Sequence, residues 1–255
     1  MASQLTEGSR LKIEWAKKHI LKLNALVLSF LKSDFYSVSI ERDSDRRTNH
    51  LVIDIDKSQF PSDDAALIIG DALHNLRSAL DLLYFQVVLA WGKTTKWTRF
   101  PIRDTREELI GPLKNALETN QISKSVHDFI LDTVKPYKAG NYPVWAVDDL
   151  NVWDKHQLLI PVLKVMCFVD IRLETDENTP VNDGIPYYLD ATSRIFLPDD
   201  RNITVKDKGV ATGIILFGLG SAYEGQPIVP ALNGIAEEIT RTIEGFDLFG
   251  MSESS

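Results

Sequence analysis

Residues 68–83 combine a strongly apolar pattern with an unusual set of polar side chains. On a helical wheel of about 100° per residue, the leucines and alanines gather mainly on one side. The opposite side carries short or directional hydrogen-bonding groups, where a surface helix usually carries Lys and Glu. These polar residues are Asp71, His74, Asn75, Arg77, Ser78 and Asp81. Because Leu82 and Leu89 continue this side as apolar, we predict a long helix covered on both sides, with its polar groups in a groove or interface.

The remaining hydrophobic pattern predicts an α+β fold. Helical spacing is expected over 9–32, 62–91, 105–118, 123–134, 144–165 and 230–246. Alternating apolar residues predict strands over 35–41, 51–55, 165–173, 186–190, 194–197, 202–205 and 212–217. The first two strands should form a hairpin. We therefore expect an N-terminal helical layer with a β-hairpin, then a mostly antiparallel sheet and a closing helix. One domain is expected over 1–255, mainly helical at about 9–165 and mainly β with a C-terminal helix at about 165–247.

Composition narrows the classes of function. The chain has 255 residues and a formal net charge of −8, which argues against a broad nucleic-acid or membrane surface. No apolar run approaches about 18 residues, and the N-terminus lacks the features of a signal peptide, so a cytoplasmic location is expected. The single cysteine, Cys167, excludes an intramolecular disulfide and a cysteine-based zinc cluster. Its apolar neighbours predict a buried strand residue.

The polar face of the central segment offers two pairings at one-turn spacing. Asp71 precedes His74 by three positions, and a carboxylate so placed can orient an imidazole and raise its pKa. Arg77 precedes Asp81 by four, and an arginine held in this way can present a fork to phosphate or carboxylate. The alternative is a hydrogen-bonded network that fixes helix packing, since such networks are common. In either case we expect Asp71, His74, Arg77 and Asp81 to be at least half buried and mutually hydrogen-bonded, because burying such groups is costly unless they are paired.

A second polar patch lies in the helix predicted over 144–165. Asp149 and His156 are two turns apart on one face, and Asp148 and Lys155 repeat that spacing beside them, whereas Asp154 is expected to point elsewhere. His156 is predicted to line the same groove as His74. The candidate catalytic residues are therefore His74, Arg77, Asp81 and His156. The candidate ligand-binding residues are Asp71, Asn75, Ser78, Asp149 and Lys155.

Other chemistries find less support in the sequence. Two histidines and an aspartate would suit zinc or iron, but no HExxH or similar motif occurs, so neither a metal nor a cofactor is expected. Phosphate-loop, dinucleotide and nucleophile-elbow motifs are also missing. His19, His50 and His127 are interpreted as incidental. Aromatic residues that are either ligand-stacking or packing groups are Trp97, Tyr137, Tyr142 and Trp145.

Three segments carry a resemblance to known proteins: Gly70–Asp81, Phe100–Ile102 and Leu150–His156. In this order they resemble a family of uncharacterised bacterial and phage proteins, over roughly residues 10–165. That family brings no established activity. Its central helix is similar to the Arg-x4–6-His helix of HEPN-type ribonucleases, all-helical dimeric enzymes that cut RNA without a metal. Arg77 matches the motif arginine, but Leu82 stands where the motif histidine would fall.

Two hypotheses follow. The first is a binding or interaction protein whose polar groove recognises an unidentified ligand. The alternative is a HEPN-like, metal-independent ribonuclease of the kind found in phage defence or toxin–antitoxin systems, in which His74 or His156 replaces the missing histidine. The acidic net charge does not indicate RNA, and no membrane partner is expected. A homodimer is expected, because a helix covered on both sides needs more partner surface than the short helices supply.

Overall fold

The computed structural model describes residues 2–43, 48–91, 98–181, 186–188, 194–197 and 201–252, and it confirms the predicted α+β class. The chain forms two compact units, each discontinuous in sequence. Unit 1 comprises Met1–Leu23, Asp63–Pro161 and Phe217–Ser255, and unit 2 comprises Asn24–Ser62 and Val162–Leu216. The hairpin therefore groups with the later strands, and the closing helix groups with the N-terminal helices. The single-domain expectation stays a prediction.

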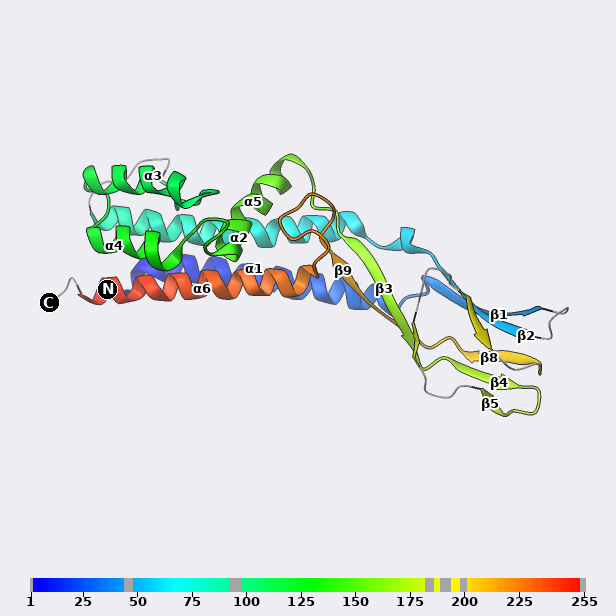
Figure 1. Cartoon of the computed structure of the whole chain (residues 1–255). Helices are drawn as coiled ribbons and strands as arrows, with labels where there is room; N and C mark the ends of the chain where they lie inside the picture. The colour runs from blue at the N-terminus through cyan, green and yellow to red at the C-terminus, as the bar shows by residue number, and fades with distance from the viewer. Residues whose placement is uncertain are drawn as a thin grey trace. The chain divides into compact units, whose positions relative to one another are not determined.

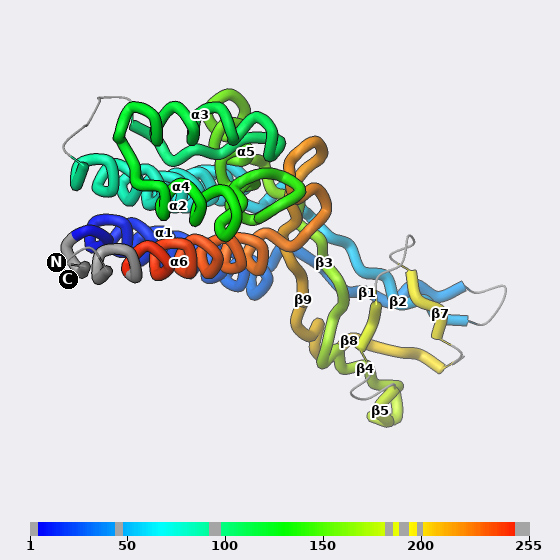
Figure 2. The backbone as a smooth tube through the Cα atoms, turned by 60° about the vertical axis from the view of Figure 1, so that its left-hand side comes forward, coloured from blue at the N-terminus to red at the C-terminus, as the bar shows by residue number. Residues whose placement is uncertain are grey.

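Unit 1 is helical. Its elements are the first part of α1 (Ala2–Leu31), then α2 (Ser62–Ala90), α3 (Arg106–Glu118), α4 (Lys124–Asp128), the π-helical turn η2 (Phe129–Val134), α5 (Tyr142–His156) and α6 (Ile228–Ser252). The long helices α1, α2 and α6 run side by side (Figures 1 and 2). Their apolar faces meet in a core that includes Ile13, Ala16, Ile20, Leu73, Leu76, Leu80, Ile235 and Ile239. Within the described residues, no helix is long and apolar enough to span a bilayer.

Local side-chain bonds explain where the shorter helices begin. Thr105 caps α3 by accepting a hydrogen bond from the backbone N–H of Glu108 at 3.3 Å, and Asn141 caps α5 in the same way. The helix predicted over 144–165 ends earlier, at His156, because Gln157 is extended and Pro161 disfavours helix in the residue before it. The helix predicted over 123–134 is divided between α4 and η2.

Unit 2 contains three small antiparallel sheets among the described residues. Their strand orders are β1-β2-β7, β6-β3-β9 and β5-β4-β8. The bounds are Tyr36–Asp43 (β1), Thr48–Ile55 (β2), Val162–Val169 (β3), Arg172–Thr175 (β4), Pro180–Val181 (β5), Tyr187–Tyr188 (β6), Arg194–Leu197 (β7), Ile203–Asp207 (β8) and Val210–Leu216 (β9), with a 3-10 turn, η1, at Lys57–Gln59. The predicted hairpin is present, with Tyr36 opposite Ile55.

Two sequence expectations in unit 2 need correction. The strand predicted over 165–173 is broken, because Asp170 adopts the left-handed conformation (φ 59°) and separates β3 from β4. Cys167 is only partly buried, and its sulfur lies 3.1 Å from the hydroxyl of Thr212 on the neighbouring strand β9. The aromatic rings of Phe35, Tyr36 and Phe168 form the inner contacts of this unit.

Candidate functional site

Arg77 is a buried cation at the centre of unit 1, with 7% of its surface exposed. Its Nε donates a hydrogen bond to Asp148 Oδ1 at 2.5 Å, and its Nη1 donates to Asp81 Oδ1 at 2.6 Å. Its Nη2 donates to the carbonyl oxygen of Phe100 at 3.1 Å. One guanidinium thus joins α2, α5 and the segment that follows α2. The predicted pairing of Arg77 with Asp81 is confirmed.

The carboxylate of Asp81 also joins α2 to the extended segment around Phe100. Its Oδ1 also accepts a hydrogen bond from the backbone N–H of Phe100 at 2.9 Å. Burial raises the pKa of Asp81 above its ordinary value, although the Arg77 charge and the Phe100 N–H act to lower it. The geometry is that of a clamp that holds the extended segment around Phe100 against α2.

A cavity of about 660 Å³ lies beside this clamp. Its walls come from α2, the extended segment 98–103, α3 and α5. The predicted residues that line it are His74, Arg77, Ser78, Asp81 and Lys155. Asn115, Gln121 and Asn151 add neutral polar groups. The cavity is therefore polar, and α2 and α5 meet on it as expected.

The charge of the cavity wall is opposite to that of the chain. Four cations line it, against the two carboxylates Asp81 and Asp148, in a chain with a net charge of −8. Both carboxylates bind Arg77. The other cations, Arg99, Arg103 and Lys155, are exposed, and among the described residues none of them has a carboxylate within ion-pair distance. Three positive groups are thus available to a ligand.

Several predicted site residues lie elsewhere. Asp71 is exposed rather than buried, and its nearest charged partner is the His19 Nδ1 at 3.9 Å. Asn75 is buried against α1, where its Oδ1 accepts a hydrogen bond from Lys12 Nζ at 3.0 Å. His156, at the end of α5, is exposed and outside the cavity. The expectation of one buried network that includes Asp71 and His74 is therefore wrong, since His74 is exposed on the cavity wall.

Asp149 faces a neighbouring hollow of about 240 Å³ rather than the cavity. Burial raises its pKa, and the nearby Lys138 charge partly offsets this effect. Lys138 Nζ lies 4.8 Å from the ring centre of Trp145, whose Nε1 donates a hydrogen bond to Asp104 at 2.9 Å. The protein's own lysine thus fills the position that a cationic ligand would take, which makes Trp145 a packing residue. Trp97 lies outside the described residues.

Asp154 was expected to point elsewhere than the face of Asp149 and His156, and it does not line the cavity. Its carboxylate lies against α2 at Gly70, so close that a Cβ atom on Gly70 would clash with Asp154 Oδ2. Oδ1 of Asp154 is buried without a hydrogen-bond partner among the described residues, and burial raises the pKa of this carboxyl. A glycine in the middle of a helical pattern was the sequence signal for this close approach.

Sequence reasoning also missed polar cavity residues: Arg99, Arg103, Asn115, Gln121, Asp148 and Asn151. The spacing of Asp148 and Lys155, two turns apart, was a usable signal because it places both on one face of α5. Arg99 and Arg103 flank the segment Phe100–Ile102 outside any helix. No periodicity indicates which way such side chains turn.

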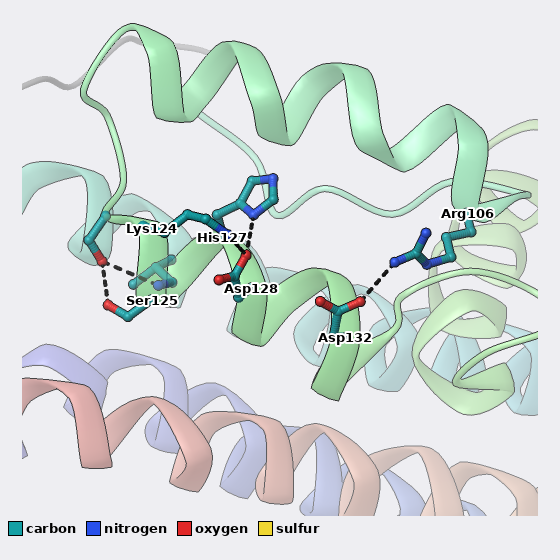
Figure 3. Close-up of polar contacts among 8 residues, drawn as sticks. Arg106, Lys124, Ser125, His127, Asp128 and Asp132 are labelled. Carbon is teal, nitrogen blue, oxygen red and sulfur yellow. Dashed lines mark hydrogen bonds and ion pairs between the residues drawn. The ribbon is translucent and has the colours of Figure 1, made fainter.

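A second polar group lies on α3, α4 and η2 (Figure 3). His127 Nδ1 is 2.8 Å from Asp128 Oδ1, and Lys124 Nζ binds the same oxygen. Arg106 Nη2 donates to Asp132 Oδ1 at 2.8 Å, which joins α3 to η2. None of these residues lines the cavity. They are surface contacts between neighbouring helical segments.

Comparisons with protein-family models, with curated proteins and with solved structures find no match. The resemblance to the bacterial and phage family and to HEPN-type ribonucleases therefore stays a prediction. Among the residues that the structure describes, no group of three His, Cys, Asp or Glu side chains is arranged to hold a metal ion.

Proposed function

We propose that this protein is a binding protein whose ligand is a small anion bearing a phosphate or carboxylate group. The ligand would occupy the cavity beside Arg77. One observation carries the proposal: Arg99, Arg103 and Lys155 converge on that cavity without carboxylate partners among the described residues. Three cations without an ion-pair partner within the described chain are unusual on one concave surface of an acidic protein, because Asp81 and Asp148 already bind Arg77 and offset only part of the positive charge.

The cavity suits such a ligand in size and in chemistry. A volume of about 660 Å³ falls within the range of small-molecule sites, roughly 300–1,000 Å³. Arginine guanidinium groups bind phosphate and carboxylate through paired N–H donors. Ser78 and Asn151 add neutral hydrogen-bonding groups that can select among anions. Arg77 takes a different part, since its bonds to Asp81 and Asp148 make it a support for the wall rather than a free cation.

Calorimetric titration of the full chain tests the proposal. Inorganic phosphate, pyrophosphate, oxalate and citrate serve as probes, so that a preference for phosphate or for carboxylate is read from the same series. We expect at least one probe to bind, with affinity that falls as salt rises. R103E and K155E should each weaken binding at least about tenfold, because each places a negative charge on the wall.

The matched control is K164E, which makes the same charge change at an exposed lysine of β3, in unit 2, that does not line the cavity. Binding should be unchanged in this variant. No heat from any of the four anions, or equal loss of binding in K164E, would contradict the proposal.

RNA cleavage is the second candidate function. The observation that favours it is that His74 lines the same cavity as Arg77, so a base and a cation lie on one wall. Against it, the guanidinium of Arg77 is engaged by two carboxylates and a carbonyl oxygen. Incubation of labelled RNA with the protein and a chelator tests this alternative, and H74A should abolish any cleavage that the wild type shows.

A further inference from the structure

One face of unit 1 carries large apolar side chains that are at least one-third exposed, and Lys18 Nζ lies 5.2 Å from the centre of one of them, the Trp15 ring. These side chains are Leu11 (66% exposed) and Trp15 (52%) on α1, and Leu67 (58%) and Leu82 (36%) on α2. Scattered exposed leucines are ordinary, but a contiguous group marks an interaction surface. We call this surface the α1–α2 face.

Contacts between the two helices place three of these residues, Leu11, Trp15 and Leu82, on one surface, whereas Leu67 lies farther along α2. A Cβ atom on Gly8 would lie 3.9 Å from Leu82 Cδ1, and Gly8, Leu11 and Trp15 follow one stripe of α1. Farther along, the His19 ring contacts the Trp15 ring at 5.6 Å and lies 3.9 Å from Asp71. The N-terminal end of α1 thus lies beside the C-terminal end of α2. The helices are antiparallel along this seam.

The charges on the two helices differ in sign. The exposed stripe of α1 continues into Lys18 and Lys22, and the exposed stripe of α2 continues into Asp71 and Asp64. In the described part of the chain, Lys18, Lys22 and Asp64 have no ion-pair partner, and Asp71 lies 3.9 Å from His19 Nδ1 and close enough to Asp154 for the two carboxylates to repel. A basic row therefore lies beside an acidic row at the same end of the face.

We infer that the α1–α2 face binds a second copy of this chain. A two-fold axis that runs along the seam would place α1 of one copy over α2 of the other and keep each residue at its own level. Lys18 and Lys22 would then meet the acidic row of the partner copy. Leu11 would lie about one helical turn from the level of Leu82, and Trp15 would lie near the level of His74 and Asn75. The face is self-complementary in charge under this one operation.

Other partners fit this face less well. An anionic membrane or a nucleic acid would be attracted by Lys18 and Lys22 but repelled by Asp64 and Asp71. A second copy supplies both signs at matching positions. This inference does not depend on the anion-binding proposal, because it concerns residues of α1 and α2 outside the charged wall of the cavity.

Sedimentation velocity of the full chain at micromolar concentrations tests the inference by charge exchange. The double variants K18E/K22E and D64K/D71K should each weaken the dimer at least about tenfold, because like charges then face each other. The variant with all four substitutions restores opposite signs across the axis and should recover the dimer. Recovery distinguishes a specific pairing from general damage to folding.

An apolar pair of variants completes the test. W15E should give a monomer, whereas L219E should remain a dimer, since Leu219 is 86% exposed in unit 1 but lies on the turn before α6, beside Trp153 of α5. Circular dichroism of each variant verifies that the helices are retained. The inference would be overturned if the wild type is a monomer at 100 µM or if W15E is still a dimer. It would also be overturned if the variant with all four charge substitutions does not recover the dimer.

Discussion

Asp148 Oδ1 accepts a hydrogen bond from Arg77 Nε at 2.5 Å, across 71 positions of sequence. This bond fastens α5 to the central helix and sets the rotation of α5 about its own axis. Lys155, two turns along, is thereby turned to the cavity, whereas Asp149, about 100° away, is turned to Lys138. The position of Lys155 on the cavity wall follows from this ion pair.

Removing the guanidinium should be among the most damaging single changes in unit 1. We expect R77M to lower the free energy of unfolding by roughly 3 kcal/mol, the lower end for a broken buried pair, because the partly buried carboxylates of Asp81 and Asp148 would lose the cation that they share. Urea denaturation followed by circular dichroism measures this loss. The control is R241M, which removes an exposed ion pair to Glu238 and should cost at most about 1 kcal/mol. Equal effects of the two changes would show that Arg77 is not a clamp.

The contact between Gly70 and Asp154 predicts an unusual response to alanine. In an open helix interior, Gly→Ala stabilises by up to about 1 kcal/mol, and G234A on α6, with open space around it, should show this gain. G70A should instead destabilise by about 1 kcal/mol, since the new methyl group would displace the Asp154 carboxylate. Thermal unfolding compares the two variants. The double variant G70A/D154A should recover the gain, and an additive double variant would argue against the contact.

Asp154 should also make stability depend on pH. Its folded pKa is raised above the ordinary value of 3.8, mainly by burial, so the folded state holds a proton that the unfolded state has released. This contribution to stability is present at low pH and is lost as pH rises through the window above 3.8. D154N should therefore gain stability relative to wild type as pH rises from about 3 to about 7. Parallel stability curves over that range would contradict this assignment.

Replacing His74 and replacing His156 should differ in their effect on ligand binding but not in their effect on stability. Both are exposed, so H74A and H156A should each change the free energy of unfolding by no more than about 0.5 kcal/mol. Only His74 lines the cavity, so only H74A should alter the binding of the anion probes. Calorimetric titration of both variants, beside their urea curves, measures the difference. A loss of binding in H156A would place the site elsewhere.

Contacts between residues of one helix or one hairpin could be predicted from the sequence alone. Helical spacing predicted α2 and the pairing of Arg77 with Asp81, because residues four apart on a helix are neighbours whatever surrounds them. The alternation of apolar and polar residues predicted the hairpin of β1 and β2, because successive side chains of a strand point to opposite faces of the sheet. The α+β class followed from the order of these patterns.

Relations between segments were decided by the tertiary structure. Asp148 and Asp149 are equivalent in a helical pattern, and only the rotation of α5 against α2 selects Asp148 for Arg77. Arg99 and Arg103 lie in an extended segment, where no periodicity predicts which residues a side chain contacts. Their positions depend on the bonds from Arg77 and Asp81 that hold Phe100 against α2. Sequence spacing encodes neighbours along one element, whereas the packing of elements fixes which side chains share a cavity and which charges remain unpaired.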